Sequence, residues 1–188
     1  MEAVVNKLGG MEGVQRFLSG ELIVSAATKV WKTFMKLKLG TGVKDADGFR
    51  KALKQADCNI GDWGNDILGK PAFKVAEAET EVELVVVSVG EFGFKDGATR
   101  AAIYKRANEL GLDLCPNEVG PQLRLQYKDQ PKGERLLIAM EPIAASVGHI
   151  EVFCISRHDD GERWLNGVLG DPGIFWVAGI HWVFLRRK

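Results

Sequence analysis

One short polar segment of the chain brings a histidine and three carboxylates together. Residues 157 to 163 contain His158, Asp159, Asp160 and Glu162. Imidazole and carboxylate groups can hold a divalent cation or activate a water molecule. The same residues suit a hairpin turn, because Asp-Asp-Gly supplies the left-handed position and the solubility that such a turn needs. We favour the turn, and we expect neither a metal site nor a bound cofactor.

The loop at residues 114 to 121 contributes two further side chains that could take part in catalysis. Proline and glycine stiffen this loop, which presents Cys115 and Glu118 just before a predicted strand. A nucleophilic cysteine needs a base, and His149 or His158 could act as one if folding brings them close. These four residues are the candidates for a small hydrolytic enzyme. An unreactive buried thiol explains Cys115 more simply, since no neighbour in sequence supplies a cation for its thiolate.

Three residues in the second half of the chain are candidates for binding a ligand. Arg124 shares one face of a predicted strand with two glutamines, and a polar sheet face can bind a ligand. Trp164 and Trp176 are two of five tryptophans and could line a groove for a ligand or a protein partner. We favour a solvated sheet face for Arg124 and core packing for the tryptophans.

Basic residues are concentrated between residues 29 and 54, where eight lysines and arginines accompany only two aspartates. Lys32, Lys36, Lys38 and Arg50 belong to this set, and aromatic residues are interleaved with them, as in some nucleic-acid binders. A solvated lysine-rich surface explains the same pattern, and no nucleic-acid recognition motif accompanies it. Nucleic-acid binding is therefore an alternative hypothesis.

The overall composition is that of a globular protein. The chain has 188 residues, 46% of them hydrophobic and 27% charged, and equal numbers of basic and acidic residues give no net charge. No global field attracts nucleic acid or a membrane, whereas weak repulsion between copies permits self-association. Three cysteines without a CxxC pair favour the reducing cytoplasm. We recognise no membrane span, signal peptide or phosphate-binding motif.

Hydrophobic spacing predicts short helices in the N-terminal part of the chain. We expect helices over residues 10 to 19, from Asp45 or Asp47 to about residue 56, and over residues 61 to 68. The second and third of these helices are expected to form a helical hairpin. A short strand is predicted over residues 34 to 39.

The pattern changes at Thr80, where alternating and then continuous apolar residues predict a central strand. A packed helix is expected to start at Asp96 or Thr99 and to end at Gly111. Further strands are predicted over residues 122 to 128, 134 to 140, 150 to 156, 163 to 168 and 180 to 186. The short turns between them favour an antiparallel meander.

The expected fold is a single α+β domain over residues 1 to 188. It has short N-terminal helices, one helix after a central strand, and a C-terminal antiparallel meander sheet. A subdomain boundary near residues 70 to 80 would separate a helical part from a sheet-rich part.

Four runs of sequence carry a resemblance to other proteins. They are FRKAL at residues 49 to 53, WGNDIL at 63 to 68, LDLCPNEVGP at 112 to 121 and WVFLRRK at 182 to 188. Together they resemble a group of short bacterial proteins without an assigned function. The resemblance implies a bacterial cytoplasmic protein, and it implies no activity, ligand or site residue.

These observations favour a non-catalytic bacterial interaction or binding module, because no complete catalytic motif is recognised. The partner is undetermined, and a protein partner or self-association fits the neutral charge. The alternatives are the hydrolytic enzyme and the nucleic-acid accessory protein described above.

Overall fold

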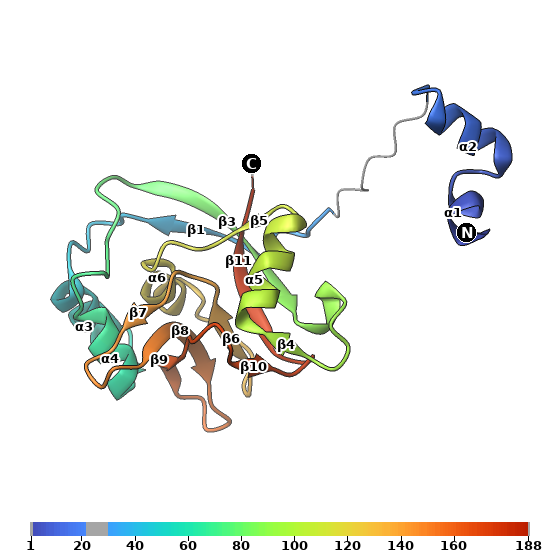
Figure 1. Cartoon of the computed structure of the whole chain (residues 1–188). Helices are drawn as coiled ribbons and strands as arrows, with labels where there is room; N and C mark the ends of the chain where they lie inside the picture. The colour runs from blue at the N-terminus through green and yellow to red at the C-terminus, as the bar shows by residue number, and fades with distance from the viewer. Residues whose placement is uncertain (1, 22–29, 188) are drawn as a thin grey trace.

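A computed structural model describes residues 2 to 21 and 30 to 187. It begins with two short helices, α1 at Glu2–Lys7 and α2 at Met11–Leu18. The helix predicted over residues 10 to 19 is confirmed, and Gly20 follows it with a left-handed φ of 80°. Figure 1 shows both helices apart from the sheet.

The rest of the fold is built on one curled, mixed sheet (Figure 1). Its main path runs in the order β1, β3, β11, β6, β8, β9 and β2. These strands span Met35–Leu39 (β1), Thr80–Ser88 (β3), His181–Arg186 (β11), Arg135–Ile138 (β6), Ile150–Arg157 (β8), Arg163–Leu169 (β9) and Cys58–Ile60 (β2). Short strands pair beside this path or with each other: β5 at Leu112–Asp113, β7 at Ile143–Ala144, and β4 at Ala98–Thr99 with β10 at Phe175–Trp176.

The expected antiparallel meander is wrong for the last strand. Strands β6, β8 and β9 do pair antiparallel in sequence, but β11 lies between β3 and β6, antiparallel to the first and parallel to the second. The physical reason is the apolar run of β3, which places Val85 opposite Phe184 and Val87 opposite Trp182. Pairing with β11 buries those side chains at the middle of the sheet.

Helices α3 at Ala46–Gln55 and α4 at Asp62–Leu68 confirm two predicted helices. The side chain of Asp45 accepts a hydrogen bond of 2.8 Å from the amide of Gly48, which caps the start of α3. The two helices do not follow each other directly as a helical hairpin. Strand β2 separates them and pairs in parallel with the start of β9 at the sheet edge.

Helix α5 at Arg100–Glu109 also follows the sequence-based prediction. The Thr99 hydroxyl caps it by accepting a 3.3 Å hydrogen bond from the amide of Ala102, and Gly111 follows it with a φ of 80°. A short 3-10 helix, η1 at Gly90–Phe92, lies between β3 and β4.

Helix α6 at Val119–Gln126 replaces the strand predicted over residues 122 to 128. The alternation of glutamine and leucine around Arg124 suggested a strand with one wet face, yet Arg124 and Leu123 are both completely buried. Pro121 fits the first helical turn, where a missing backbone N–H costs no internal hydrogen bond. Close contact with the sheet determines the conformation here.

A single hydrophobic core contains residues that precede and residues that follow the segment 70 to 80. Phe73, within that segment, packs edge-on against Phe49 of α3 at 5.8 Å between ring centroids and against Phe153 of β8 at 6.1 Å. The α+β class is therefore confirmed, with helices α3 to α6 and the sheet sharing this core. No helix in the described part of the chain is long and apolar enough to cross a membrane.

Candidate functional site

Among the described residues lies a cavity of about 680 Å³, which we call the sheet-face cavity. It opens where β6, β8 and β9 meet the start of α4. Its lining combines backbone, polar and charged groups: Gly61, Asp62, Trp63, Gly133, Glu134, Arg135, Cys154, Ser156, Arg157, His158, Asp159, Asn166, Gly167 and Val168. Such a volume matches that of small-molecule sites.

Strand alternation explains which side chains reach the sheet-face cavity. Phe153 of β8 packs on α6, because a Cβ at Gly120 would lie only 2.7 Å from its side chain. Side chains one residue along a strand point to the opposite face, so Cys154 and Ser156 turn toward the cavity. Asn166 of β9 lies opposite Cys154 in the strand register and completes this polar face.

Charges of both signs surround the sheet-face cavity. Arg135, Arg157, Asp62, Glu134 and Asp159 all belong to its lining. None of these five groups takes part in an ion pair within residues 2 to 21 and 30 to 187. Arg157 donates a 2.9 Å hydrogen bond to the carbonyl of Gln130, and one carboxylate oxygen of Glu134 is buried. The charged groups that the cavity offers to a ligand are therefore those of Arg135, Asp62 and Asp159.

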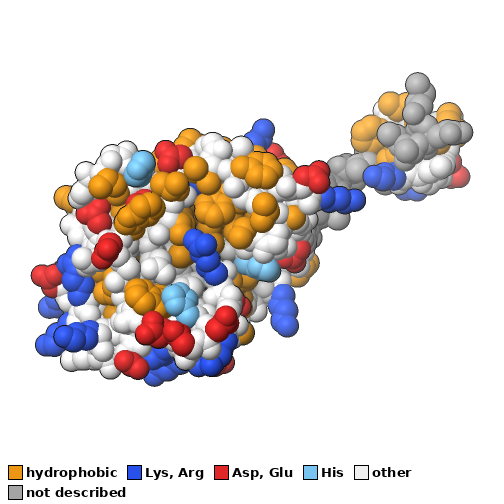
Figure 2. All heavy atoms as spheres, turned by 90° about the horizontal axis from the view of Figure 1, so that it is seen from below, with side chains coloured by type: hydrophobic (Ala, Val, Ile, Leu, Met, Phe, Trp, Pro, Cys, Tyr) orange, Lys and Arg blue, Asp and Glu red, His pale blue; other side chains and the backbone are white. Residues whose placement is uncertain are grey.

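Aromatic rings lie beside these polar groups. Trp63 lines the cavity and is 46% exposed. Trp164, a candidate from the sequence, stacks on His158 with ring centroids 5.5 Å apart and planes inclined by 19°. Figure 2 views the molecule from below, and it shows a histidine side chain next to acidic side chains.

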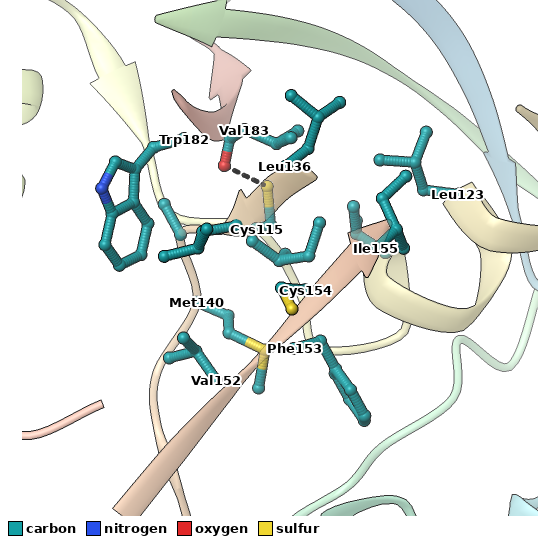
Figure 3. Close-up of a cluster of buried hydrophobic side chains, with 14 of the residues drawn as sticks. Cys115, Leu123, Leu136, Met140, Val152, Phe153, Cys154, Ile155, Trp182 and Val183 are labelled. Carbon is teal, nitrogen blue, oxygen red and sulfur yellow. Dashed lines mark hydrogen bonds between the residues drawn. The ribbon is translucent and has the colours of Figure 1, made fainter. Parts of the chain in front are cut away.

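Cys115 lies away from the sheet-face cavity, in the apolar interior. Its thiol donates a hydrogen bond of 3.5 Å to the carbonyl of Val183 and is surrounded by apolar side chains (Figure 3). Burial raises the pKa of this thiol above its usual range. The thiolate that a nucleophile requires is therefore disfavoured.

Glu118 holds together three segments of the fold. It is 1% exposed, and one carboxylate oxygen accepts hydrogen bonds from the amide of Gly40 at 2.8 Å and from Nε2 of Gln122 at 2.9 Å. The other oxygen accepts one from the amide of Ala76 at 2.8 Å. Its hydrogen bonds go to the protein itself, which accounts for its burial.

The two histidines of the hydrolytic hypothesis lie at opposite ends of β8. His149 precedes the strand and His158 follows it. At about 3.3 Å per residue, nine residue steps separate their backbones by roughly 30 Å. The structure therefore does not bring Cys115, Glu118, His149 and His158 together.

The remaining ligand-binding candidates, Arg124 and Trp176, make contacts within the protein interior. Arg124 donates hydrogen bonds to the carbonyls of Ser156 at 3.2 Å and Tyr127 at 2.6 Å, and also to the side chain of Gln130. Trp176 packs edge-on against Trp182 with ring centroids 5.5 Å apart. Neither residue lines the sheet-face cavity.

Much of the basic segment is neutralised by neighbouring carboxylates. Lys36 pairs with Glu81 at 3.1 Å and Lys38 pairs with Glu79 at 2.9 Å, both across the β1–β3 edge. Arg50 pairs with Asp47 at 2.7 Å. Lys32 is exposed, and Lys29, at the start of the segment, lies outside the described residues. The positive excess read from residues 29 to 54 therefore overstates the local charge.

Most residues that line the sheet-face cavity were not among the candidates suggested by the sequence. Ser156 and Asn166 lie inside strands whose positions were predicted, but only the register between β8 and β9 places them on one face. Arg135 comes from a third strand, β6, opposite Ser156. The available signal was a polar Asn-Gly pair inside the run predicted as β9, where apolar residues would be usual.

Comparison of the chain with protein-family models, with curated proteins and with solved structures gave no match.

Proposed function

We propose that this chain is a non-catalytic, cytoplasmic bacterial binding module that holds a small zwitterionic ligand, an amino acid or short peptide, in the sheet-face cavity. The observation that carries the proposal is the set of unpaired charges of both signs around one cavity of about 680 Å³. A zwitterion supplies the complementary pair of charges within one small molecule.

The individual groups fit the two ends of such a ligand. The guanidinium group of Arg135 suits a carboxylate, because its planar donors can bind both of the carboxylate oxygens. The carboxylates of Asp62 and Asp159 suit an ammonium group. Trp63 offers an apolar surface between them for the rest of the ligand.

The same structure gives less support to the two alternatives. A hydrolytic enzyme needs a nucleophile next to a base, and Cys115 is buried apart from both histidines considered. A nucleic-acid accessory protein needs free cations, and three of the four basic candidates are engaged in ion pairs. Three free, buried cysteines fit a reducing compartment.

Titration of the ¹⁵N-labelled full chain with amino acids and dipeptides, followed by NMR, tests the proposal. We expect shifts of the amides of Ser156, Asn166 and Gly167, and weaker or no shifts with acetate or methylammonium, which supply only one charge. The substitutions Arg135→Gln and Asp62→Asn should each weaken binding by about tenfold, because each removes one charged contact.

Arg106→Gln is the matched control, since Arg106 is an arginine of α5 whose side chain is 43% exposed and which is absent from the cavity lining. It should bind as the unchanged protein does. The proposal is wrong if no zwitterion shifts the cavity amides, or if Arg135→Gln and Asp62→Asn bind as tightly as the control.

A further inference from the structure

Three side chains at the tip of the β8–β9 hairpin lie close enough to share one metal ion. His158, Asp160 and Glu162 each offer a ligand atom, and these atoms all lie within 4.8 Å of one another. Gly161, at a φ of 100°, allows the tight turn that places them together. We call this set the hairpin-tip cluster. It combines imidazole with two carboxylates, so its donor chemistry is that of a transition-metal site.

The backbone of the turn and a neighbouring tryptophan hold the cluster in place. The amide of His158 donates to the carbonyl of Glu162 at 2.9 Å, and the amide of Gly161 donates to the carbonyl of His158 at 2.9 Å. Stacking on Trp164 fixes the imidazole plane, and Nε1 of Trp164 donates a 3.0 Å hydrogen bond to Glu162. Contacts of this kind orient metal ligands before the metal arrives.

A second observation is the position of His158 on the wall of the sheet-face cavity. The imidazole thus belongs both to the hairpin-tip cluster and to a hollow that can admit a ligand or water. The charge of Lys132 opposes a cation, because its Nζ donates a 2.8 Å hydrogen bond to the carbonyl of Asp159. The flanking Arg157 and Arg163 instead donate to the carbonyls of Gln130 and Ala56. Two carboxylates in the cluster outweigh that single positive charge.

We propose that the hairpin-tip cluster binds a divalent transition metal ion, with Zn²⁺ as the best fit, through His158, Asp160 and Glu162. Nitrogen and oxygen donors suit Zn²⁺, and three protein ligands leave a coordination position for water or another ligand. The proposal does not depend on the zwitterion proposed above. Each can fail without the other.

Isothermal titration of ZnCl₂ into the full chain, previously treated with a chelator, tests the metal site at pH 7.5. We expect one bound ion per chain. His158→Ala, Asp160→Asn and Glu162→Gln should each weaken this binding by about tenfold or more, because each removes one ligand. All three positions are exposed at a hairpin tip, so the variants should fold.

Asp159→Asn is the matched control, because it removes a neighbouring carboxylate that is outside the cluster. It should retain the affinity for Zn²⁺. Absent binding, or equal weakening by Asp159→Asn and the three ligand variants, would overturn the proposal.

Trp164→Phe separates the role of orientation from that of ligation. It removes the hydrogen bond to Glu162 but keeps an aromatic ring beside His158. We expect one Zn²⁺ still to bind, with an affinity between those of the unchanged protein and His158→Ala. If His158→Ala left Zn²⁺ binding unchanged, the ion would bind elsewhere and the proposed site would be wrong.

Discussion

A buried carboxylate in β8 has no hydrogen-bond partner among the described residues. Glu151 is completely buried, and neither of its side-chain oxygens receives a donor. It lies against Gly167, where a Cβ would come within 2.3 Å of one oxygen, and beside the backbone of α4. Burial, and then the negative charge of Asp66, raise the pKa of Glu151.

The effect of Glu151 on stability should depend on pH. The folded state holds the proton more tightly than the unfolded chain, so its contribution is complete below the unfolded pKa of about 4.3 and is lost as the pH rises through the higher folded pKa. Glu151→Gln cannot ionise. We therefore expect this variant to gain stability over the unchanged protein by about 1 kcal/mol as the pH rises from 4 to 8.

Urea unfolding at several pH values measures this difference. Glu141→Gln provides the control, because Glu141 is an exposed glutamate that precedes the β7–β8 hairpin. Its stability should follow the same pH dependence as the unchanged protein. A pH-independent difference between Glu151→Gln and the unchanged protein would contradict the interpretation.

At the scale of elements, the contact between α6 and β8 shows how packing determines local conformation. Gly120 lets the helix lie directly on Phe153, and a Cβ there would come within 2.7 Å of Cβ and the ring of Phe153. Alanine is normally the better helix former by about 0.5 to 1 kcal/mol. At position 120 we expect alanine to give a less stable protein than glycine.

Gly120→Ala should destabilise the protein by about 1 to 3 kcal/mol, because an overpacked core must shift to admit the methyl group. Thermal and urea unfolding measure the loss. Gly173→Ala is the control, since a Cβ at Gly173 meets no atom within 4 Å and its φ is not left-handed. If both variants were equally stable, the close packing of α6 on β8 would be refuted.

Elements with a local signal were predictable from the sequence, and elements set by distant contacts were not. Asp45 and Thr99 each cap a helix through their own side chains, so α3 and α5 could be located from nearby residues alone. The conformation around Arg124 depends on partners in β8 and in the loop after α6, which the sequence does not place. The residue pattern around Arg124 therefore indicated a strand.

The candidate site was harder to predict than the fold for the same reason. His158 could be singled out because its carboxylate neighbours adjoin it in sequence. Arg135, Ser156 and Asn166 come from three strands, and only the register of the sheet assembles them. A site built across strands leaves no contiguous motif.

At the scale of the whole molecule, the hydrophobic core crosses the segment that could have divided the chain. Phe73 is 8% exposed and joins Phe49 of the first part to Phe153 of the second through edge-on ring contacts. Trp31, near the start of the sheet-bearing part, similarly contacts Phe92 at 5.8 Å between ring centroids. Residues from both sides of the boundary are therefore expected to unfold together.

Phe73→Ala tests this cooperativity. Removal of the ring should cost about 3 kcal/mol, since it leaves a cavity between two other buried rings. Urea unfolding curves followed by tryptophan fluorescence and by far-ultraviolet circular dichroism should still coincide, with a lower midpoint for both. Phe175→Ala, at a phenylalanine that is 58% exposed, should leave the midpoint nearly unchanged. A shared core cannot lose one half while the other half stays packed. If the variant or the unchanged protein showed two separated transitions, the parts on either side of residues 70 to 80 would therefore fold independently.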